Sequence, residues 1–374
     1  MRLIDFFDRG AALYPDRACL VGGAVSLTFA EVQRRTHRIA NRLISAGIGP
    51  QMGAAVLSPN DADAFSCILG ILRAGGAWMP LNARNAVDDN AAILADNDCR
   101  FLFYHSSFAA AAEEMRKKVP TLIGLVCVDR AGADPDLASW LAEANDDPCY
   151  VPSGPHDLAS IWPSGGTTGR SKGVMLTNLN FATMIANFIT SMPIRKPPVH
   201  LIAAPMTHAA GCISFPLLAQ GATTVLIPSA DALLVMESIQ HHKVTTLFLP
   251  PTVIYMMLGH PRVREFDYSS LTHFVYAAAP MSAEKLKEAM EIFGPVMAQT
   301  FGQAEAPMLC TFLSPEEHKV VGDPKLEKRL MSCGRSTVFA QVEVMDDDGN
   351  ILPPNEKGEI VVRGNLVKIG RAHV

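Results

Sequence analysis

Hydrophobic and polar residues alternate along the first third of the chain with a helical period. Thr28 and Glu31 have the spacing of a capping box, in which each side chain bonds the other residue's backbone N–H. After them, positions suited to burial recur every three or four residues, and Gly47 follows. These positions are Phe29, Val32, Thr36, Ile39 and Leu43. The pattern predicts a helix that begins after Thr28 and ends before Gly47.

Short, continuous apolar runs alternate with further helical patterns and predict buried strands. Asn60 precedes one of these patterns, and we expect it to cap a helix. Later helices are expected to begin near Asn178, His208, Asp231, Pro251 and Ser282. The runs are "GAAVL", "GAWMPL", "RFLFY", "TLIGLVCV", "LASIW", "HLIAAP", "ATTVLI", "TTLFL" and "HFVYAA". This alternation predicts an α/β fold with parallel-type sheets covered by helices.

Changes in the pattern suggest three parts. The segment 143–157 is polar and rich in proline, and we expect it to join an N-terminal α/β subdomain, 1–150, to a second one, 151–330. From 331 to 368 the pattern changes to "QVEVM", the turn "DDDGN" and "EIVVRG". Such strands around a turn predict the start of a small, antiparallel β-rich subdomain.

Composition narrows the class of protein. The 374 residues are 49% hydrophobic and 18% charged with a formal net charge of −5, so a large core is possible and no basic run favours nucleic acid as a partner. The eight cysteines have no C-x-x-C spacing, and most lie in apolar runs, which indicates reduced thiols and a cytoplasmic location. We find no signal peptide, membrane span or protein-built zinc motif. The oligomeric state cannot be read from these features.

The segment "IWPSGGTTGRSKGV", 161–174, places glycines, hydroxyl residues and a lysine directly after an apolar run. Glycines let backbone N–H groups approach a ligand closely, and hydroxyl and ammonium groups add donors. Such a loop suits a phosphate, although a plain hydrophilic turn is the alternative. It is not a Walker A loop, because Arg170 and Ser171 separate Gly169 from Lys172.

Two more segments follow predicted strands, where ligands of α/β sheets bind. His208 lies in "APMTHAAG", 204–211; taken alone, it fits a capping or core histidine better than a functional one. Phe301, Gly302 and Glu305 lie in "AQTFGQAEA", 298–306. An aromatic ring there could stack on a flat base and a carboxylate could bind Mg²⁺, but an ordinary strand-to-helix turn is the alternative.

Together these segments resemble the adenylate-forming superfamily of acyl-CoA synthetases, peptide-synthetase adenylation domains and luciferases. "SGGTTGRSKG" resembles its phosphate loop, and the other motifs occur in the expected order up to about Lys368. They are "LTFAEVQRRTHRIANRL", "LRAGGAWMPLN", "PMTHAAG", "VYAAAPM" with "TFGQAEA", and "GEIVVRGNLV".

The resemblance implies a large N-terminal domain in which a carboxylate attacks ATP, giving acyl-adenylate and pyrophosphate, before coenzyme A takes the acyl group. By similarity, the phosphate loop binds ATP, Glu305 ligates Mg²⁺, and His208 stands beside the acyl carboxylate and the approaching thiol. His208, Glu305 and Lys172 are the expected catalytic residues. The expected nucleotide-binding residues are Ser164, Gly165, Gly166, Thr167, Thr168, Gly169, Lys172, Ala278, Ala279, Gln299, Phe301 and Gly302.

The chain departs from the family at several positions. Gly165 and Ser171 replace a usual serine and proline, and Ala304 replaces a usual threonine that contacts the α-phosphate. Losing that hydrogen bond would cost about 1.5–3 kcal/mol of ATP binding. After Val367, "IGRAHV" fits none of the family's pattern, so we expect 369–374 to be an artefactual tail. The family's ribose-binding aspartate and C-terminal lid domain are missing as well, so we expect turnover to be impaired.

The substrate is expected to be a fatty-acyl or aryl acid. Small residues, Ala209 to Gly211 and Ala277 to Ala279, stand where the acyl group should lie, and no acidic residue there would pair an ammonium group. Two alternatives remain: a nucleotide- or acyl-binding protein without turnover, and an adenylating enzyme whose acceptor is a carrier protein.

Overall fold

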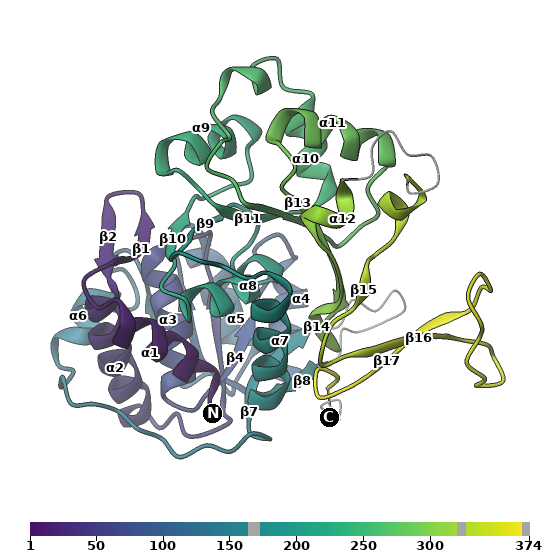
Figure 1. The fold of residues 1–374 in the computed structure, drawn as a ribbon. Helices are drawn as coiled ribbons and strands as arrows, with labels where there is room; N and C mark the ends of the chain where they lie inside the picture. Colours follow the sequence, from purple (N-terminus) through teal and green to yellow (C-terminus); the bar gives the residue numbers. More distant parts are fainter. Residues whose placement is uncertain (164–172, 320–326, 369–374) are drawn as a thin grey trace.

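The computed structural model describes residues 1–163, 173–319 and 327–368. Within them the chain forms two large sheets, a small two-stranded sheet, and helices between and around them (Figure 1). Among the helices that the structure describes, none combines the length and apolar character needed to cross a bilayer.

The first large sheet has the strand order β6-β5-β3-β4-β7-β8. Its neighbours pair in parallel except β7 and β8, which are antiparallel. The strands are β3 (Gly53–Leu57), β4 (Ala77–Pro80), β5 (Cys99–Tyr104), β6 (Gly124–Cys127), β7 (Leu158–Pro163) and β8 (Gly173–Thr177).

The second large sheet has the order β15-β14-β13-β12-β11-β9-β10-β1-β2. The six strands from β13 to β1 pair in parallel, and the edge strands are antiparallel. The strands are β1 (Ala18–Gly22), β2 (Val25–Thr28), β9 (Val199–Ile202), β10 (Thr223–Leu226), β11 (Thr246–Leu249), β12 (His273–Tyr276), β13 (Met297–Gln303), β14 (Ala306–Leu313) and β15 (Arg335–Ser336).

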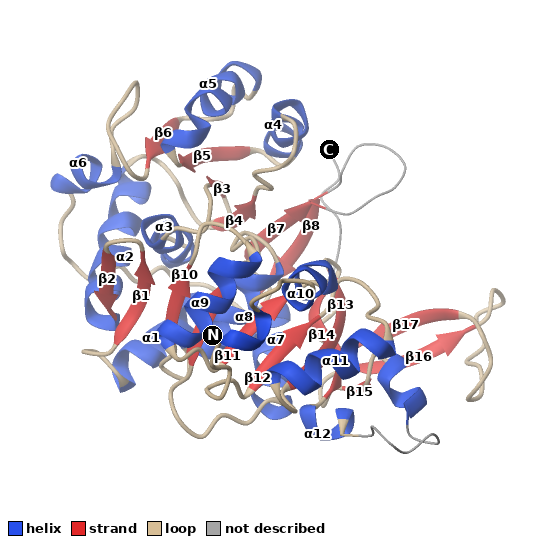
Figure 2. Ribbon diagram, turned by 90° about the horizontal axis from the view of Figure 1, so that it is seen from above, coloured by secondary structure: helices blue, strands red, loops and turns tan. Residues whose placement is uncertain are grey.

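Helices separate the two sheets and cover their outer faces. The α-helices are α1 (Leu3–Leu13), α2 (Phe29–Ser45), α3 (Ala62–Arg73), α4 (Val87–Asp96), α5 (Ala109–Lys118), α6 (Leu137–Ala142), α7 (Asn178–Ser191), α8 (Ala209–Leu218), α9 (Ala232–His242), α10 (Pro251–Leu258), α11 (Ala283–Phe293) and α12 (Pro315–His318). Helices α3 and α7 contact strands of both sheets, whereas α5 packs on β5 and α11 on β13. Figure 2 shows α4 and α5 at one end of the molecule and α11 and α12 at the other.

The predicted α/β class is confirmed, and each predicted strand run contains an observed strand. The capping box of Thr28 and Glu31 is present at the start of α2. Each large sheet draws strands from both sides of residue 150: β7 and β8 extend the first sheet, and β1 and β2 join the second. The hairpin of β16 (Gln341–Met345) and β17 (Glu359–Arg363) extends away from the two large sheets (Figure 1).

The prediction for Asn60 is wrong. Asp61 caps α3, because its carboxylate accepts the Ala64 N–H at 2.9 Å. The buried Asn60 amide instead donates to the carbonyls of Ala204 and Ile227 at 3.1 and 2.9 Å, and accepts the Met206 N–H at 2.7 Å. Backbone groups beyond the ends of β9 and β10 need such partners when they are buried, so the asparagine satisfies them rather than the helix.

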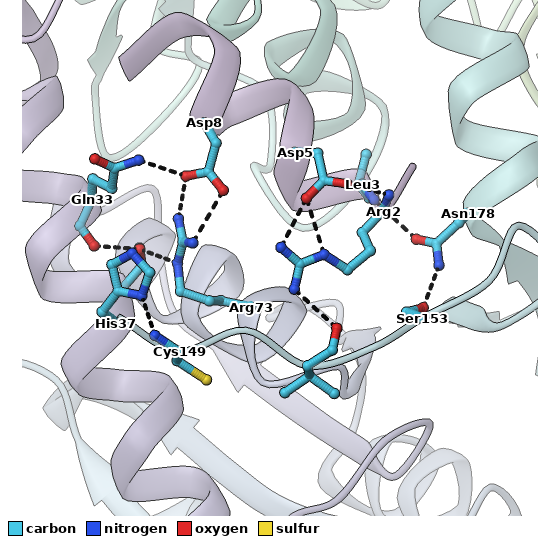
Figure 3. A network of polar contacts seen from close by, with 12 residues as sticks. Arg2, Leu3, Asp5, Asp8, Gln33, His37, Arg73, Cys149, Ser153 and Asn178 are labelled. Carbon is cyan, nitrogen blue, oxygen red and sulfur yellow. Dashed lines mark hydrogen bonds and ion pairs between the residues drawn. The ribbon is translucent and has the colours of Figure 1, made fainter. Parts of the chain in front are cut away.

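The side chains of Arg2, His37 and Asn178 hold the segment 143–157 in place (Figure 3). The Arg2 guanidinium donates to the Val151 carbonyl at 3.3 Å, and the Cys149 N–H donates to Nδ1 of His37 at 2.8 Å. The Asn178 side chain donates to Ser153 Oγ at 3.0 Å. Since this segment leads into β7, these bonds fix the approach to that strand.

Beside them lies an ion pair whose arginine is fully buried, also drawn in Figure 3. Arg73 is fully buried, and its guanidinium donates to both carboxylate oxygens of Asp8, at 3.1 and 2.5 Å, and to Thr36 Oγ1 at 2.8 Å. Gln33 also donates to Asp8, at 2.8 Å. We call Asp8, Gln33, Thr36 and Arg73 the N-terminal clamp.

Candidate active site

Two adjoining cavities open where strands of both large sheets end. The larger has a volume of about 560 Å³ and the smaller about 330 Å³. They share four wall residues: Ala277, Ala278, Thr300 and Gly302. A single ligand with two chemically different halves could therefore occupy both cavities at once. This position agrees with the rule that ligands of α/β sheets bind beyond the carboxyl ends of strands.

The larger cavity is almost entirely apolar. Its described wall contains no Asp, Glu, Lys or Arg side chain. Trp162, Ala209, Cys212 and Phe248 are among the residues that form it. Such a wall gives no counter-ion for a substrate's ammonium group and favours an alkyl chain or an aromatic ring. The predicted small residues Ala209, Ala210, Ala277 and Ala278 all lie in this wall, and Ala279 lies in the smaller one.

Gly211 does not lie in either wall, against the expectation. A Cβ atom at this position would meet the Met206 carbonyl oxygen at 1.8 Å. The first turn of α8 therefore approaches the preceding loop too closely for any side chain. Gly211 lets α8 begin directly beside the loop that carries His208, so its contribution is to position that loop.

His208 stands in the wall of the larger cavity, directly before α8. Its side chain does not cap the helix; it packs edge-on against Trp162, with 6.2 Å between ring centroids. Its Nδ1 lies 3.1 Å from the hydroxyl of Thr207. Burial lowers the pKa of His208, which favours the neutral ring near pH 7.

Hydrogen-bond counting assigns the tautomer of His208. The Thr207 hydroxyl donates to the Leu81 carbonyl at 2.9 Å, and a hydroxyl has a single hydrogen to donate. It can therefore only accept from Nδ1, so the ring hydrogen lies on Nδ1 and Nε2 keeps its lone pair. A neutral Nε2 repels a carboxylate oxygen but accepts a hydrogen bond from a thiol, an amine or a hydroxyl.

The wall of the smaller cavity contains an aromatic ring, apolar side chains and polar side chains. Phe301, Gln299, Ala278 and Ala279 all lie in its wall. Ala278 has a φ of 73°, in the left-handed region that alanine rarely adopts. A Cβ atom at Gly302 would meet the Met308 backbone at 2.6–2.8 Å, so the close approach of β13 and β14 requires glycine here. This wall suits a planar ring with polar edges.

Glu305 lies in the turn between β13 and β14 and is half-buried. A hairpin follows β13 here, not the helix of the alternative interpretation. Glu305 does not line either cavity, whereas its neighbour Ala304 lines the larger one. Across the described parts of the chain, no three His, Cys, Asp or Glu side chains gather as a metal site. Mg²⁺ in nucleotide sites takes few protein ligands, so one carboxylate fits that use.

Seven predicted site residues lie outside the residues that the structure describes: Ser164, Gly165, Gly166, Thr167, Thr168, Gly169 and Lys172. The strands on either side of them are β7 and β8, and Pro163 at the end of β7 lines the larger cavity.

Sequence reasoning missed three residues that contribute to the walls or support them. Trp162 lies in the segment 161–174, but no function was predicted for it. Its ring packs edge-on against both His208 and Trp78. Thr207 orients His208, and its position next to a histidine was the available signal. Tyr276, behind Gln299, shows no local signal because its partners are far away in sequence.

Comparison with known families agrees with this geometry. The family described as "AMP-binding enzyme" matches residues 7–370. A feruloyl-CoA synthase from Amycolatopsis sp is 30% identical over 367 residues, which are 96% of this chain and 70% of the relative. The medium/long-chain-fatty-acid–CoA ligase FadD8 of Mycobacterium tuberculosis is 29% identical, over 96% of this chain and 63% of the ligase.

Solved structures share the fold. The amide bond synthetase McbA from Marinactinospora thermotolerans superposes with a TM-score of 0.90 at 27% identity, over 99% of this chain and 72% of that one. The N-terminal domain of FACL13 from Mycobacterium tuberculosis superposes with a TM-score of 0.89 at 23% identity, over 100% of this chain and 91% of that domain. The second likeness concerns the fold alone.

Proposed function

Because this chain belongs to the AMP-binding enzyme family, we propose that it joins a carboxylic acid to the AMP moiety of ATP, releasing pyrophosphate, and passes the acyl group to coenzyme A. The observation that carries this proposal is the shared wall of the two cavities. An acyl-adenylate has an apolar half and a nucleotide half joined at one phosphate. The larger cavity suits the first half and the smaller suits the second.

The acid in this proposal is an alkyl or aryl carboxylic acid. The larger cavity's apolar wall supports it, as do the relatives that act on feruloyl and fatty-acyl groups. A volume of about 560 Å³ lies within the usual range of pockets for small organic ligands. The proposal includes Mg²⁺ held by Glu305, phosphate binding by Ser164 to Lys172, and base binding by Phe301, Gln299 and Gly302.

His208 has a narrower role in this proposal than the sequence suggested. Its Nε2 lone pair does not attract a carboxylate, but it can accept a hydrogen bond from the incoming thiol. The neutral ring is also a general base for that thiol, and such a group typically contributes 10²–10⁴-fold to a rate. The eight cysteines, all free and seven of them buried, support a reducing compartment such as the cytoplasm.

A panel of carboxylic acids tests the first half-reaction by pyrophosphate release in the presence of ATP and Mg²⁺. Release with alkyl or aryl acids and not with amino acids is expected. Glu305→Gln should abolish the magnesium-dependent release, because an amide is a poor ligand for a hard dication. Glu316→Gln makes the same substitution at an exposed position outside both cavity walls and is the matched control.

A binding measurement separates ligand recognition from turnover. Acyl sulfamoyl-adenosines mimic the acyl-adenylate without reacting, and they should bind more tightly than either half alone. Binding without pyrophosphate release would favour a protein that binds but does not turn over. Acyl transfer to a carrier protein, with none to coenzyme A, would change the acceptor. No binding and no release would overturn the proposed function.

A further inference from the structure

A chain of hydrogen-bonding groups, two of them on buried side chains, stands behind the wall of the smaller cavity. Tyr276 and Gln299 are direct neighbours in register on β12 and β13. The Tyr276 hydroxyl lies 3.3 Å from Oε1 of Gln299 and 3.0 Å from Nε2 of His318, the last residue of α12. Nδ1 of His318 lies 2.7 Å from the Ser314 carbonyl oxygen. Tyr276 and His318 are both buried, whereas Gln299 reaches the cavity.

The hydrogens of this chain can be counted from its Ser314 end. A backbone carbonyl only accepts, so Nδ1 of His318 carries a hydrogen and donates it. Burial lowers the pKa of His318, and the ring is therefore neutral near pH 7. Its Nε2 then has a lone pair and accepts the hydrogen of the Tyr276 hydroxyl.

This count decides which end of the Gln299 amide faces Tyr276. The Tyr276 hydroxyl has given its only hydrogen to His318 and has only lone pairs left for Gln299. An amide oxygen at that place would face another acceptor, whereas the amide nitrogen would donate. The two ends of an amide are nearly the same size, so the hydrogen-bond partners decide its orientation. The nitrogen therefore faces Tyr276, and the oxygen is left to meet a ligand in the cavity.

We infer that Ser314, His318 and Tyr276 form a relay that fixes the Gln299 amide with its oxygen toward the smaller cavity. The cavity then selects a purine with an amino group at its six-position over one with an oxo group. An amino group donates to the Gln299 oxygen, whereas an oxo group faces it as a second acceptor. This inference rests on the proposed function, because it takes the smaller cavity as the base site.

Tyr276 and His318 are positioning residues in this inference, since neither lies in a cavity wall. The readout must therefore be the preference between two bases and not the strength of binding alone. AMP and IMP suit this purpose because they differ at the six-position and its neighbouring ring nitrogen. Titration calorimetry of the chain with each nucleotide gives the ratio of the two dissociation constants without any turnover.

The wild-type chain should bind AMP at least about tenfold more tightly than IMP, the usual size for one hydrogen bond replaced by a clash of acceptors. Tyr276→Phe frees the amide to turn, so the ratio should fall to about threefold or less. Tyr268→Phe is the matched control: this tyrosine is also buried, but its hydroxyl donates to the Val263 carbonyl and it lies outside both walls. The control should keep the wild-type ratio.

A second pair of variants guards against a fold defect in Tyr276→Phe. His318→Gln keeps one donor and one acceptor and should keep the ratio, whereas His318→Leu should lose it. Equal binding of AMP and IMP by the wild type overturns the inference alone. A ratio unchanged in both Tyr276→Phe and His318→Leu also overturns it, because the residues would then be purely structural. No binding of AMP overturns both the inference and the proposed function.

Discussion

The N-terminal clamp and the relay behind Gln299 are both polar networks built around buried side chains, but they differ in whether they end at a cavity. In the clamp, the Arg73 guanidinium meets the Asp8 carboxylate and Thr36, and neither Arg73 nor Asp8 lines one of the two cavities. In the relay, Ser314, His318 and Tyr276 are linked in series to Gln299, which lines the smaller cavity. We therefore expect a network that ends within the protein to contribute mainly to stability. A network that ends at a cavity also orients the side chain that meets the ligand.

The largest change in stability is expected from a substitution at Asp8. Asp8→Ala leaves the fully buried Arg73 guanidinium without its counter-ion, which should cost about 3–5 kcal/mol of unfolding free energy. Urea unfolding measures the loss. The AMP to IMP ratio of the protein that remains folded should not change, because the clamp has no atom in either cavity.

The matched control for this change is Glu265→Ala. Glu265 pairs with Arg262, and both side chains are largely exposed, so the expected loss is at most about 1 kcal/mol. Equal losses in Asp8→Ala and Glu265→Ala would contradict the view that burial makes the clamp pair important.

The sequence predicted the local elements of this fold better than their assembly. Strand runs such as "GAAVL" and "TTLFL" and the capping box at Thr28 depend on neighbouring residues, and all are present. The assignment of strands to sheets depends on contacts between distant segments. No local pattern showed that β7 and β8 extend the sheet of β3, or that β1 pairs with β10.

The same limit applies to the candidate site. The cavity walls include His208, Phe301 and Ala278, which motifs identified. Asn60 was misread because an asparagine before a helix is a common cap, and the sequence does not show the buried carbonyls beyond the ends of β9 and β10 to which it donates. His318 and Tyr276 are 42 residues apart, so only the fold brings them together.

A buried histidine outside both networks, His200, should make the stability of the protein depend on pH. His200 on β9 is fully buried, and its Nδ1 lies 3.2 Å from the Thr246 carbonyl oxygen. Burial holds the pKa of His200 at about 4, below its ordinary value near 6.5. The unfolded chain therefore binds more protons between pH 6.5 and 4, so stability falls as the pH falls through this window.

The expected loss attributable to His200 is about 2 kcal/mol between pH 7 and pH 5. Urea unfolding at both values measures it, and His200→Leu should reduce the difference by that amount. If this variant does not fold, the ring signals of His200 in a nuclear magnetic resonance titration replace it. A ring that titrates near pH 6.5 in the folded protein would contradict the prediction.

A second open network, at the larger cavity, tests whether orientation can be separated from stability. Thr207 holds His208 through its hydroxyl, as Tyr276 holds Gln299. Thr207→Val removes that hydroxyl, and acyl transfer to coenzyme A should slow by about tenfold while the unfolding free energy falls by about 1 kcal/mol. Thr207→Ser keeps the hydroxyl and should restore the rate. Equal rates in the valine and serine variants would show that the hydroxyl does not orient His208.

The smallest expected effect concerns the wall that the two cavities share, where the backbone itself carries the strain. Ala278 adopts a φ of 73°, which costs an L-residue about 1–2 kcal/mol, and glycine avoids this cost. Glycine also makes the unfolded chain more flexible, which takes back about 0.4–1 kcal/mol. Ala278→Gly should therefore raise the unfolding free energy slightly, by about 0.5–1 kcal/mol.

The control is the neighbouring Ala277, which does not have a positive φ, so Ala277→Gly should lower the unfolding free energy by a similar amount. Urea unfolding of both variants compares the signs, and the same sign in both would contradict a strained Ala278. A gain in stability accompanied by weaker AMP binding would indicate that this strain holds the shared wall in the shape that the nucleotide needs.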